Sequence, residues 1–302
     1  MSEYITHIGV LDDTARLALH SDEICDAFKL CFTDYHTVAR MGSSSRGNNT
    51  YIVQNLDYFR DIWKNRKPED RLEEKLAYTL GWITHRSADK YVKATNESFD
   101  DNPENSHPND IRILHDVIIY EKVYNNGQED PFTEGFMEQN MESHPASHSM
   151  NVRMAEFLFT HVYQSELMEL QSFKDVNDGE AFMARLFDQF AELTVDFDRH
   201  INAYENPNET LREKLIQEPN FYQDSDPIIK LARALQHNQT LPDVSLSEAL
   251  KAEDQSRYAE ILIKTYRWIR EGSRYFTREI DVDKKHMFDF YQIWEGNIVE
   301  RY

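Results

Sequence analysis

His85 and Asp89 are the two residues whose types and spacing point most directly to chemistry. They stand four positions apart in the run LAYTLGWITHRSADKYVK, residues 76–93, which has the pattern of a helix. At 3.6 residues per turn, the two side chains share one face of that helix. Small residues such as Gly81 and Ala88 lie near that face, so a carboxylate there is expected to be buried and to need a partner. A metal ion bound by both side chains and a direct His–Asp ion pair both meet that need.

Two further histidines are candidates for the same site. His115 shares the face of a predicted helix with Ile118 and Ile119, so its ring is expected to point into an apolar interior. His7 lies close to the N-terminus and is a candidate fourth ligand. Two adjacent antiparallel helices would bring the His85 and His115 imidazoles together with the Asp89 carboxylate, a set that suits zinc or another divalent ion with open positions for water. A buried polar network of histidines without a metal is the equally weighted alternative.

The composition predicts the fold that must position these residues. Gly and Pro are scarce, at 9 each, whereas good helix formers are plentiful. No stretch of the sequence has a strand pattern of any length. We therefore expect an all-α, multi-helix globular bundle of about ten helices. Residues 1–150 would form the metal-binding half, and residues 151–302 a helical half packed on it within one continuous domain.

Several boundaries follow from local signals. Glycine and serine in GSSSRGNN predict a loop, and Pro68 is well placed to begin the central helix. The predicted segments are a helix over 22–41, a loop over 42–49, the central helix over 69–95 and a last long helix over 246–270.

Three residues within the predicted helices carry separate expectations. Gly81 weakens the central helix one turn before His85, which predicts a close approach by a metal or by another helix. Asp12 or Asp13 is interpreted as an acid near a helix start, where the helix dipole favours negative charge.

Charge and apolar patterning exclude some partners. With 33 basic and 54 acidic residues the net charge is −21, which opposes binding to bulk nucleic acid or to an anionic bilayer. No apolar run is long enough for a transmembrane segment, and the start does not resemble a signal peptide. We therefore expect a soluble cytoplasmic protein with reduced cysteines. The aromatic-rich residues 271–302 predict either core or an interface, and an interface there would make the protein a homo-oligomer through its C-terminal half.

The run AYTLGWITHRSADKYV resembles the zinc-dependent phospholipase C family, which is related to the trinuclear-zinc nucleases. Those all-α proteins carry Leu-Gly-x-x-x-His-x-x-x-Asp on a central helix, and Leu80, Gly81, His85 and Asp89 match it. His7, in YITHIGVL, is similar to the family's N-terminal histidine. The resemblance covers the first half of the chain.

This resemblance implies a metal-dependent phosphoester hydrolase. Asp89 would be a catalytic residue and metal ligand, His115 would be a further ligand, and the substrate would be a small-molecule or lipid phosphoester. The family's acidic ligand is missing from residues 42–49. Lys90 stands where a histidine often follows the signature aspartate, and Ile119 stands where a glutamate follows the later histidine. The resemblance therefore implies a reduced metal site.

A second resemblance leads to a different ligand set. His85 followed thirty residues later by His115 and Asp116 resembles the His…His-Asp pattern of HD-domain phosphohydrolases. In that reading Asp116 replaces Asp89 as ligand and catalytic carboxylate, and Asp196 or Asp198 completes the site. A third alternative is a non-catalytic all-α binding or scaffold protein in which the histidines are structural.

Overall fold

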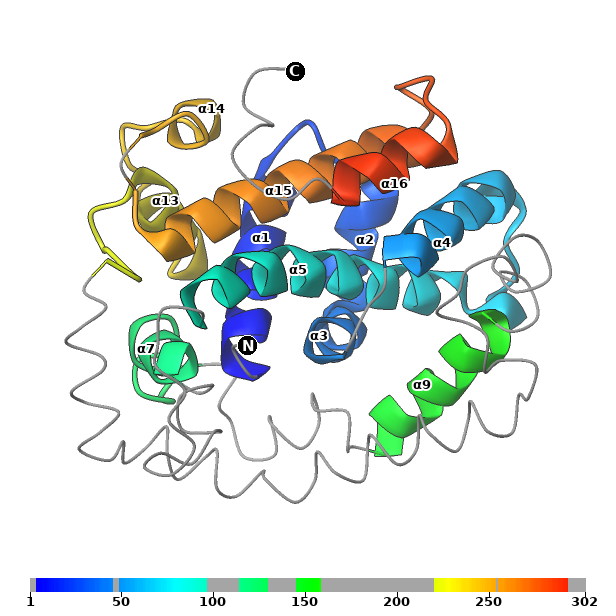
Figure 1. Cartoon of the computed structure of the whole chain (residues 1–302), viewed down its shortest axis with the longest axis horizontal. Helices are drawn as coiled ribbons and strands as arrows, with labels where there is room; N and C mark the ends of the chain where they lie inside the picture. Colours follow the sequence, from blue (N-terminus) through cyan, green and yellow to red (C-terminus); the bar gives the residue numbers. More distant parts are fainter. Residues whose placement is uncertain are drawn as a thin grey trace.

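The computed structural model of the chain describes residues 4–45, 49–96, 114–129, 145–158, 220–253 and 255–292. Every regular element within these ranges is a helix, which confirms the predicted all-α, multi-helix globular fold (Figure 1). The described α-helices are α1 (Tyr4–His20), α2 (Asp26–Asp34), α3 (His36–Ser44), α4 (Asn49–Ile62), α5 (Leu72–Asn96), α7 (Leu114–Lys122), α9 (Pro145–Phe157), α13 (Pro227–Gln236), α14 (Leu246–Ala249), α15 (Arg257–Phe276) and α16 (Lys284–Gln292). Two 3₁₀ turns, η1 (Trp63–Asn65) and η2 (Pro68–Asp70), connect α4 to α5.

Helix α1 is enclosed by its neighbours. Every residue from Tyr4 to Ala15 is buried, and a helix buried on all sides lies inside a structure rather than on its surface. It packs against α3, α5, α7, α13 and α15, and it crosses α5 and α15 in Figure 1. The N-terminal helix, together with α5, is therefore the element around which the described helices are arranged.

The α3–α5 crossing brings two backbones into direct contact. A Cβ atom on Gly81 would lie 2.1 Å from the Ala39 carbonyl oxygen, and one on Gly42 would lie 2.2 Å from that of Tyr78. Only glycine allows such an approach. The close approach that Gly81 predicted is thus made by another helix, α3.

Two predicted boundaries in the first hundred residues are wrong in detail. The helix predicted over 22–41 is interrupted at Tyr35, between α2 and α3. Helix α3 then continues to Ser44, so the start of the predicted loop 42–49 is helical. The glycine that suggested a loop is needed for the helix crossing, and packing outweighs its low helix propensity.

The last long helix also differs from its prediction. Instead of one helix over 246–270, the chain forms the short α14, a non-helical connection, and then α15. The Ser256 hydroxyl accepts a hydrogen bond from the Ala259 backbone and caps the start of α15. Asp226 accepts from the Ser256 backbone N–H, which fixes this start from another part of the chain.

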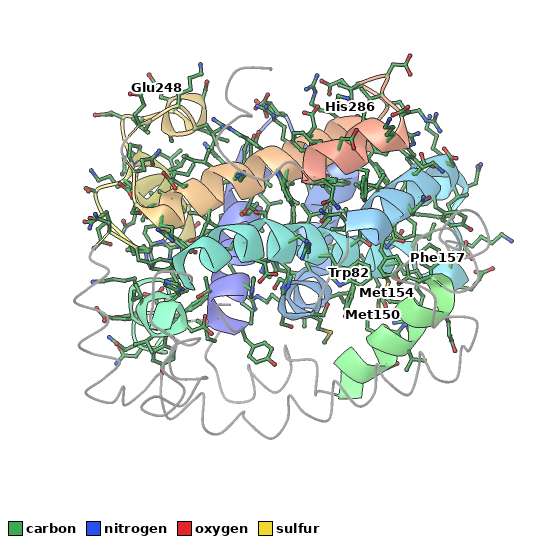
Figure 2. All side chains as sticks on the ribbon, viewed as in Figure 1. Trp82, Met150, Met154, Phe157, Glu248 and His286 are labelled. Atoms are coloured by element: carbon green, nitrogen blue, oxygen red, sulfur yellow. The ribbon has the colours of Figure 1, made fainter. Side chains whose placement is uncertain are left out.

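Apolar side chains attach the peripheral helices to the central ones. Met150, Met154 and Phe157 lie along α9 (Figure 2) and are buried, and the Phe157 ring stacks on Phe59 of α4 at a centroid distance of 5.2 Å. In the C-terminal part, Tyr291 is buried against Trp268 of α15. None of the described helices combines the length and the apolar character needed to cross a membrane.

Candidate metal centre

His7, His85 and Asp89 come together where α1 meets α5. One possible ligand atom from each residue lies within 4.8 Å of the other two. The three residues are only 3%, 7% and 4% exposed. In the ranges that the structure describes, no other group of three histidine, cysteine or acidic residues has this geometry. The arrangement is a buried group of two imidazoles and one carboxylate.

Helix geometry accounts for how the three residues meet. His85 and Asp89 stand one turn apart on α5, as their spacing predicted. His7 comes from the start of α1, whose N-terminal end is flanked by α3 and α7 in Figure 1. The rings of His7 and His85 stack with their centroids 4.2 Å apart and an interplanar angle of 23°. The packing of α1 on α5 therefore supplies the third member of the group.

A backbone carbonyl of α3 determines how the His85 ring is oriented. His85 Nδ1 lies 2.9 Å from the carbonyl oxygen of Ser43. A carbonyl oxygen can only accept, so Nδ1 carries the proton and the neutral ring has its lone pair on Nε2. Histidines that bind a metal usually donate their other ring N–H to a carboxylate, a backbone carbonyl or water, as His85 does to Ser43. The hydrogen-bond acceptor is the Ser43 backbone, so no side chain in the sequence indicates it, but Gly81 predicted the close approach of α3 and α5 that places this carbonyl.

Asp89 has a cation nearby on its own helix. Arg86 Nη1 lies 3.7 Å from Asp89 Oδ2, which is beyond hydrogen-bond distance. The Nε of Arg86 donates to the side-chain oxygen of Asn49 at 3.3 Å. Arg86 thus adds positive charge beside the Asp89 carboxylate and is partly exposed.

The other two predicted site residues lie in different surroundings. The His115 ring stacks on Phe221 at a centroid distance of 4.2 Å and is not a member of the three-residue group. Asp116 accepts hydrogen bonds from the backbone N–H groups of Ile5 and Thr6 at the start of α1. Both residues are buried, as the helix pattern predicted for His115. The two alternative aspartates of the HD-like reading, at positions 196 and 198, lie outside the described residues.

A second buried polar group occupies the middle of α1. Asp12 accepts from Arg40 Nε at 2.8 Å and Nη2 at 3.0 Å, and it is 2.8 Å from His36 Nε2. The Tyr124 hydroxyl donates to its other oxygen at 2.9 Å. The interpretation of Asp12 or Asp13 as an acid at a helix start is wrong, because both lie in the interior of α1 and are buried.

Asp13, like Asp12, accepts hydrogen bonds from arginines and from a tyrosine. It accepts from Arg16 at 2.6 Å and from Tyr258 at 3.0 Å, and Arg233 also donates to it. These contacts connect α1 to α13 and α15, whereas those of Asp12 connect it to α3 and to Tyr124, just beyond α7.

Charge compensation fixes the protonation states of this second group. Burial alone would raise the pKa of Asp12, but Arg40 and His36 hold that pKa well below its usual range. Burial, with the nearby aspartates, raises the pKa values of Tyr124 and Tyr258. Both phenols therefore stay protonated and donate, and the Asp12 carboxylate stays ionised. We call Asp12, Asp13 and these partners the α1 ion network.

No family model matches this chain, and comparison with curated proteins and with solved structures finds no match either. The resemblances described above therefore rest on the quoted residues alone.

Proposed function

We propose that His7, His85 and Asp89 bind zinc or another divalent metal ion, and that the protein is a metal-dependent phosphoester hydrolase with a reduced, phospholipase C-like site. The observation that carries this proposal is the group itself: three buried ligand atoms within 4.8 Å of one another, from two helices. The N-terminal histidine and the His-x-x-x-Asp pair of the resemblance are the residues that meet.

The residues fit such an ion chemically. Two imidazole nitrogens and a carboxylate oxygen form the His₂-carboxylate set of many catalytic zinc sites, which keep a further position open for water or substrate. The hydrogen bond to Ser43 leaves His85 Nε2 as the coordinating nitrogen. A buried carboxylate beside two neutral rings would balance part of the charge of a divalent cation, which reduces the cost of burying it.

Each side chain then has a role in hydrolysis. A divalent ion bound here would activate water and neutralise charge on the phosphoryl group. Asp89 and the two histidines would hold the cation. The partly exposed guanidinium of Arg86, beside Asp89, would bind a phosphate oxygen of the substrate.

The substrate proposed is a small-molecule or lipid phosphoester. The net charge of −21 opposes a bulk polyanion such as duplex nucleic acid. The phospholipase C-like architecture is part of this proposal and is supported by Leu80, Gly81, His85 and Asp89. Cytoplasmic location and a homo-oligomer through the C-terminal half stay predictions.

The HD-like alternative needs Asp116 as a metal ligand. Its described contacts with Ile5 and Thr6 give that role no support, because both carboxylate oxygens accept hydrogen bonds from α1. The non-catalytic alternative treats His7, His85 and Asp89 as a structural network. The non-catalytic alternative is an outcome of the experiment that follows, and the HD-like alternative is tested by the Asp116→Asn variant described in the next subsection.

The test is phosphoester hydrolysis by metal-loaded protein. Hydrolysis of bis-p-nitrophenyl phosphate and p-nitrophenyl phosphate is measured with zinc or manganese, and again after chelation. We expect metal-dependent turnover that falls by about a hundredfold or more in Asp89→Asn, because losing a ligand should exceed the typical 10–100-fold cost of losing an outer-shell partner. Asp226→Asn is the matched control, because Asp226 is a buried carboxylate outside the group. Wild type that binds metal but hydrolyses neither ester would overturn the proposal.

A further inference from the structure

The start of α1 is capped by a residue from a distant part of the chain. The first N–H groups of a helix have no partner within the helix. The Ile5 N–H donates to one oxygen of Asp116 at 3.1 Å, and the Thr6 N–H donates to the other at 2.8 Å. The Thr6 hydroxyl donates to that second oxygen as well. Asp116 thus binds two successive residues that immediately precede His7.

The same carboxylate lies at the N-terminal ends of two helices. Asp116 is in the first turn of α7 and also faces the first turn of α1. Both helix dipoles favour negative charge at this point. Asp116 is completely buried, so the hydrogen bonds to its charged oxygens are shielded from water. This carboxylate therefore joins the start of α1 to α7.

A second contact between α1 and α7 lies one turn further along. A Cβ atom on Gly9 would stand 2.7 Å from Cγ2 of Ile119, so the two helices are in close contact there too. In the sequence His7 falls between the two contacts, at Ile5 and Thr6 on one side and Gly9 on the other. The stretch of α1 that presents His7 to α5 is thus bound to α7 at both ends.

We infer that Asp116 is a positioning residue for His7. This inference rests on the metal centre proposed above. Asp116 fixes the first turn of α1 and thereby holds the His7 ring against His85. Without this cap the first turn loses three hydrogen bonds, and His7 no longer has a fixed position relative to the ligands on α5. Metal affinity should therefore depend on a carboxylate that does not touch the metal.

The chain contains a matched control for this arrangement. Asp226 binds the start of α15 in a similar way, accepting from the Ser256 backbone N–H at 3.0 Å and from the Ser256 hydroxyl. Helix α15 contributes no member of the His7–His85–Asp89 group. Loss of either cap should lower stability, but only loss of the Asp116 cap should alter the metal centre.

The experiment compares Asp116→Asn with Asp226→Asn in the full chain. The Kd for zinc is measured by competition with a chromophoric chelator, well below the unfolding temperature of each variant. We expect Asp116→Asn to raise this Kd about tenfold, as for an outer-shell partner, and to change the visible spectrum of the cobalt(II) form. Asp226→Asn should lower the unfolding temperature but leave the zinc Kd within about twofold of wild type.

Variants at Thr6 perturb the same contact less, because they change one of its three hydrogen bonds. They replace Asp116→Asn in the experiment if that variant does not fold. Thr6→Val removes the hydroxyl donor but keeps the shape, and should raise the zinc Kd about threefold, the effect of one hydrogen bond. Thr6→Ser keeps the hydroxyl and should restore the wild-type value and cobalt(II) spectrum.

Three results would overturn the inference. In the first, Thr6→Val and any folded Asp116→Asn protein keep the wild-type Kd and cobalt(II) spectrum. In the second, Asp226→Asn weakens zinc binding as much as Asp116→Asn does. In the third, Asp116→Asn binds no metal at any excess, which would make Asp116 a ligand. Wild type that binds neither zinc nor cobalt(II) would overturn both this inference and the proposed function. Wild type that binds metal as expected but hydrolyses no phosphoester would overturn the proposed function alone.

Discussion

Helix α1 contributes to two buried polar groups that differ in how their charge is balanced. In the α1 ion network, arginines donate to Asp12 and Asp13 at hydrogen-bond distance. In the candidate metal centre, Arg86 Nη1 stands 3.7 Å from Asp89 Oδ2, beyond hydrogen-bond distance, and the other two members are imidazoles. Arginine is always charged and cannot bind a metal, whereas a neutral imidazole is a common metal ligand.

This difference in charge balance predicts that one group mainly stabilises the fold and the other mainly binds a metal ion. A buried carboxylate held by arginines is balanced within the protein, so removing it leaves buried cations without an acceptor. The charge of a carboxylate beside two histidines can be neutralised by a metal cation that binds from solution. We therefore expect changes in the α1 ion network to affect folding first, and changes in the candidate metal centre to affect metal binding first.

The largest expected effect is that of Asp12→Ala. This change leaves Arg40 and His36 without their shared carboxylate, and breaking a buried ion pair from one side costs about 3–5 kcal/mol. Urea unfolding at pH 7 with a chelator present measures the loss. A loss of unfolding free energy as small as that of an exposed ion pair would show that Asp12 does not neutralise Arg40 and His36 in a buried network.

Gly81→Ala should lower the unfolding free energy by about 3 kcal/mol, nearly as much as Asp12→Ala. The new Cβ atom would clash with backbone atoms, which cannot move aside as a side chain can. The nearest atom, 2.1 Å away, would be the Ala39 carbonyl oxygen. The matched control is Gly272→Ala, whose Cβ would lie 2.7 Å from the Tyr291 hydroxyl, the end of a side chain. Equal losses in the two variants would argue against a backbone contact at the α3–α5 crossing.

Zinc should stabilise the wild type by about 2.7 kcal/mol when its free concentration is a hundred times the Kd. The Asp89→Asn protein should gain almost nothing at the same concentration, yet its stability in chelator should stay close to that of wild type. Thermal unfolding with and without zinc measures both quantities. A large loss of stability in chelator would place Asp89 with the structural carboxylates instead.

The smallest expected effect is a difference in acid sensitivity. The folded-state pKa of Asp12 is depressed, since Arg40 and His36 outweigh burial. Its contribution to stability is therefore complete above the unfolded pKa of about 3.9. This contribution is lost as pH falls from there toward the lower folded pKa, at up to about 1.4 kcal/mol per pH unit. Between pH 5 and pH 3 the unfolding free energy should fall less steeply in Asp12→Asn than in wild type. Equal slopes would contradict a depressed folded-state pKa for Asp12.

Much of the fold could be predicted from composition and periodicity. Scarce glycine and proline predicted an all-helical chain, and the spacing of His85 and Asp89 placed them on one helix face. What failed was local: Gly42 predicted a loop but serves a helix crossing, and the helix predicted over 246–270 is divided by the cap at Ser256. The crossing joins distant segments, so no local signal reports which helices meet; the Ser256 cap is local, but the Asp226 carboxylate that holds Ser256 comes from another part of the chain.

The candidate site was predictable in its residue types and less so in its partners. His7, His85 and Asp89 were all candidates from sequence, but only packing brings α1 onto α5. His115 and Asp116 are buried as well, yet they pack on an aromatic ring and on the start of α1. A helix pattern shows that a side chain points inward, and it does not show which side chain it meets there.

Metal content shows directly whether His7, His85 and Asp89 bind an ion. Wild type, Asp89→Asn and Asp226→Asn are purified without a tag, exposed to zinc, dialysed and analysed by plasma mass spectrometry. Binding at His7, His85 and Asp89 predicts about one zinc ion per chain in wild type and Asp226→Asn, and close to none in Asp89→Asn. Wild type that retains no metal, or Asp89→Asn that retains as much as wild type, would contradict the account.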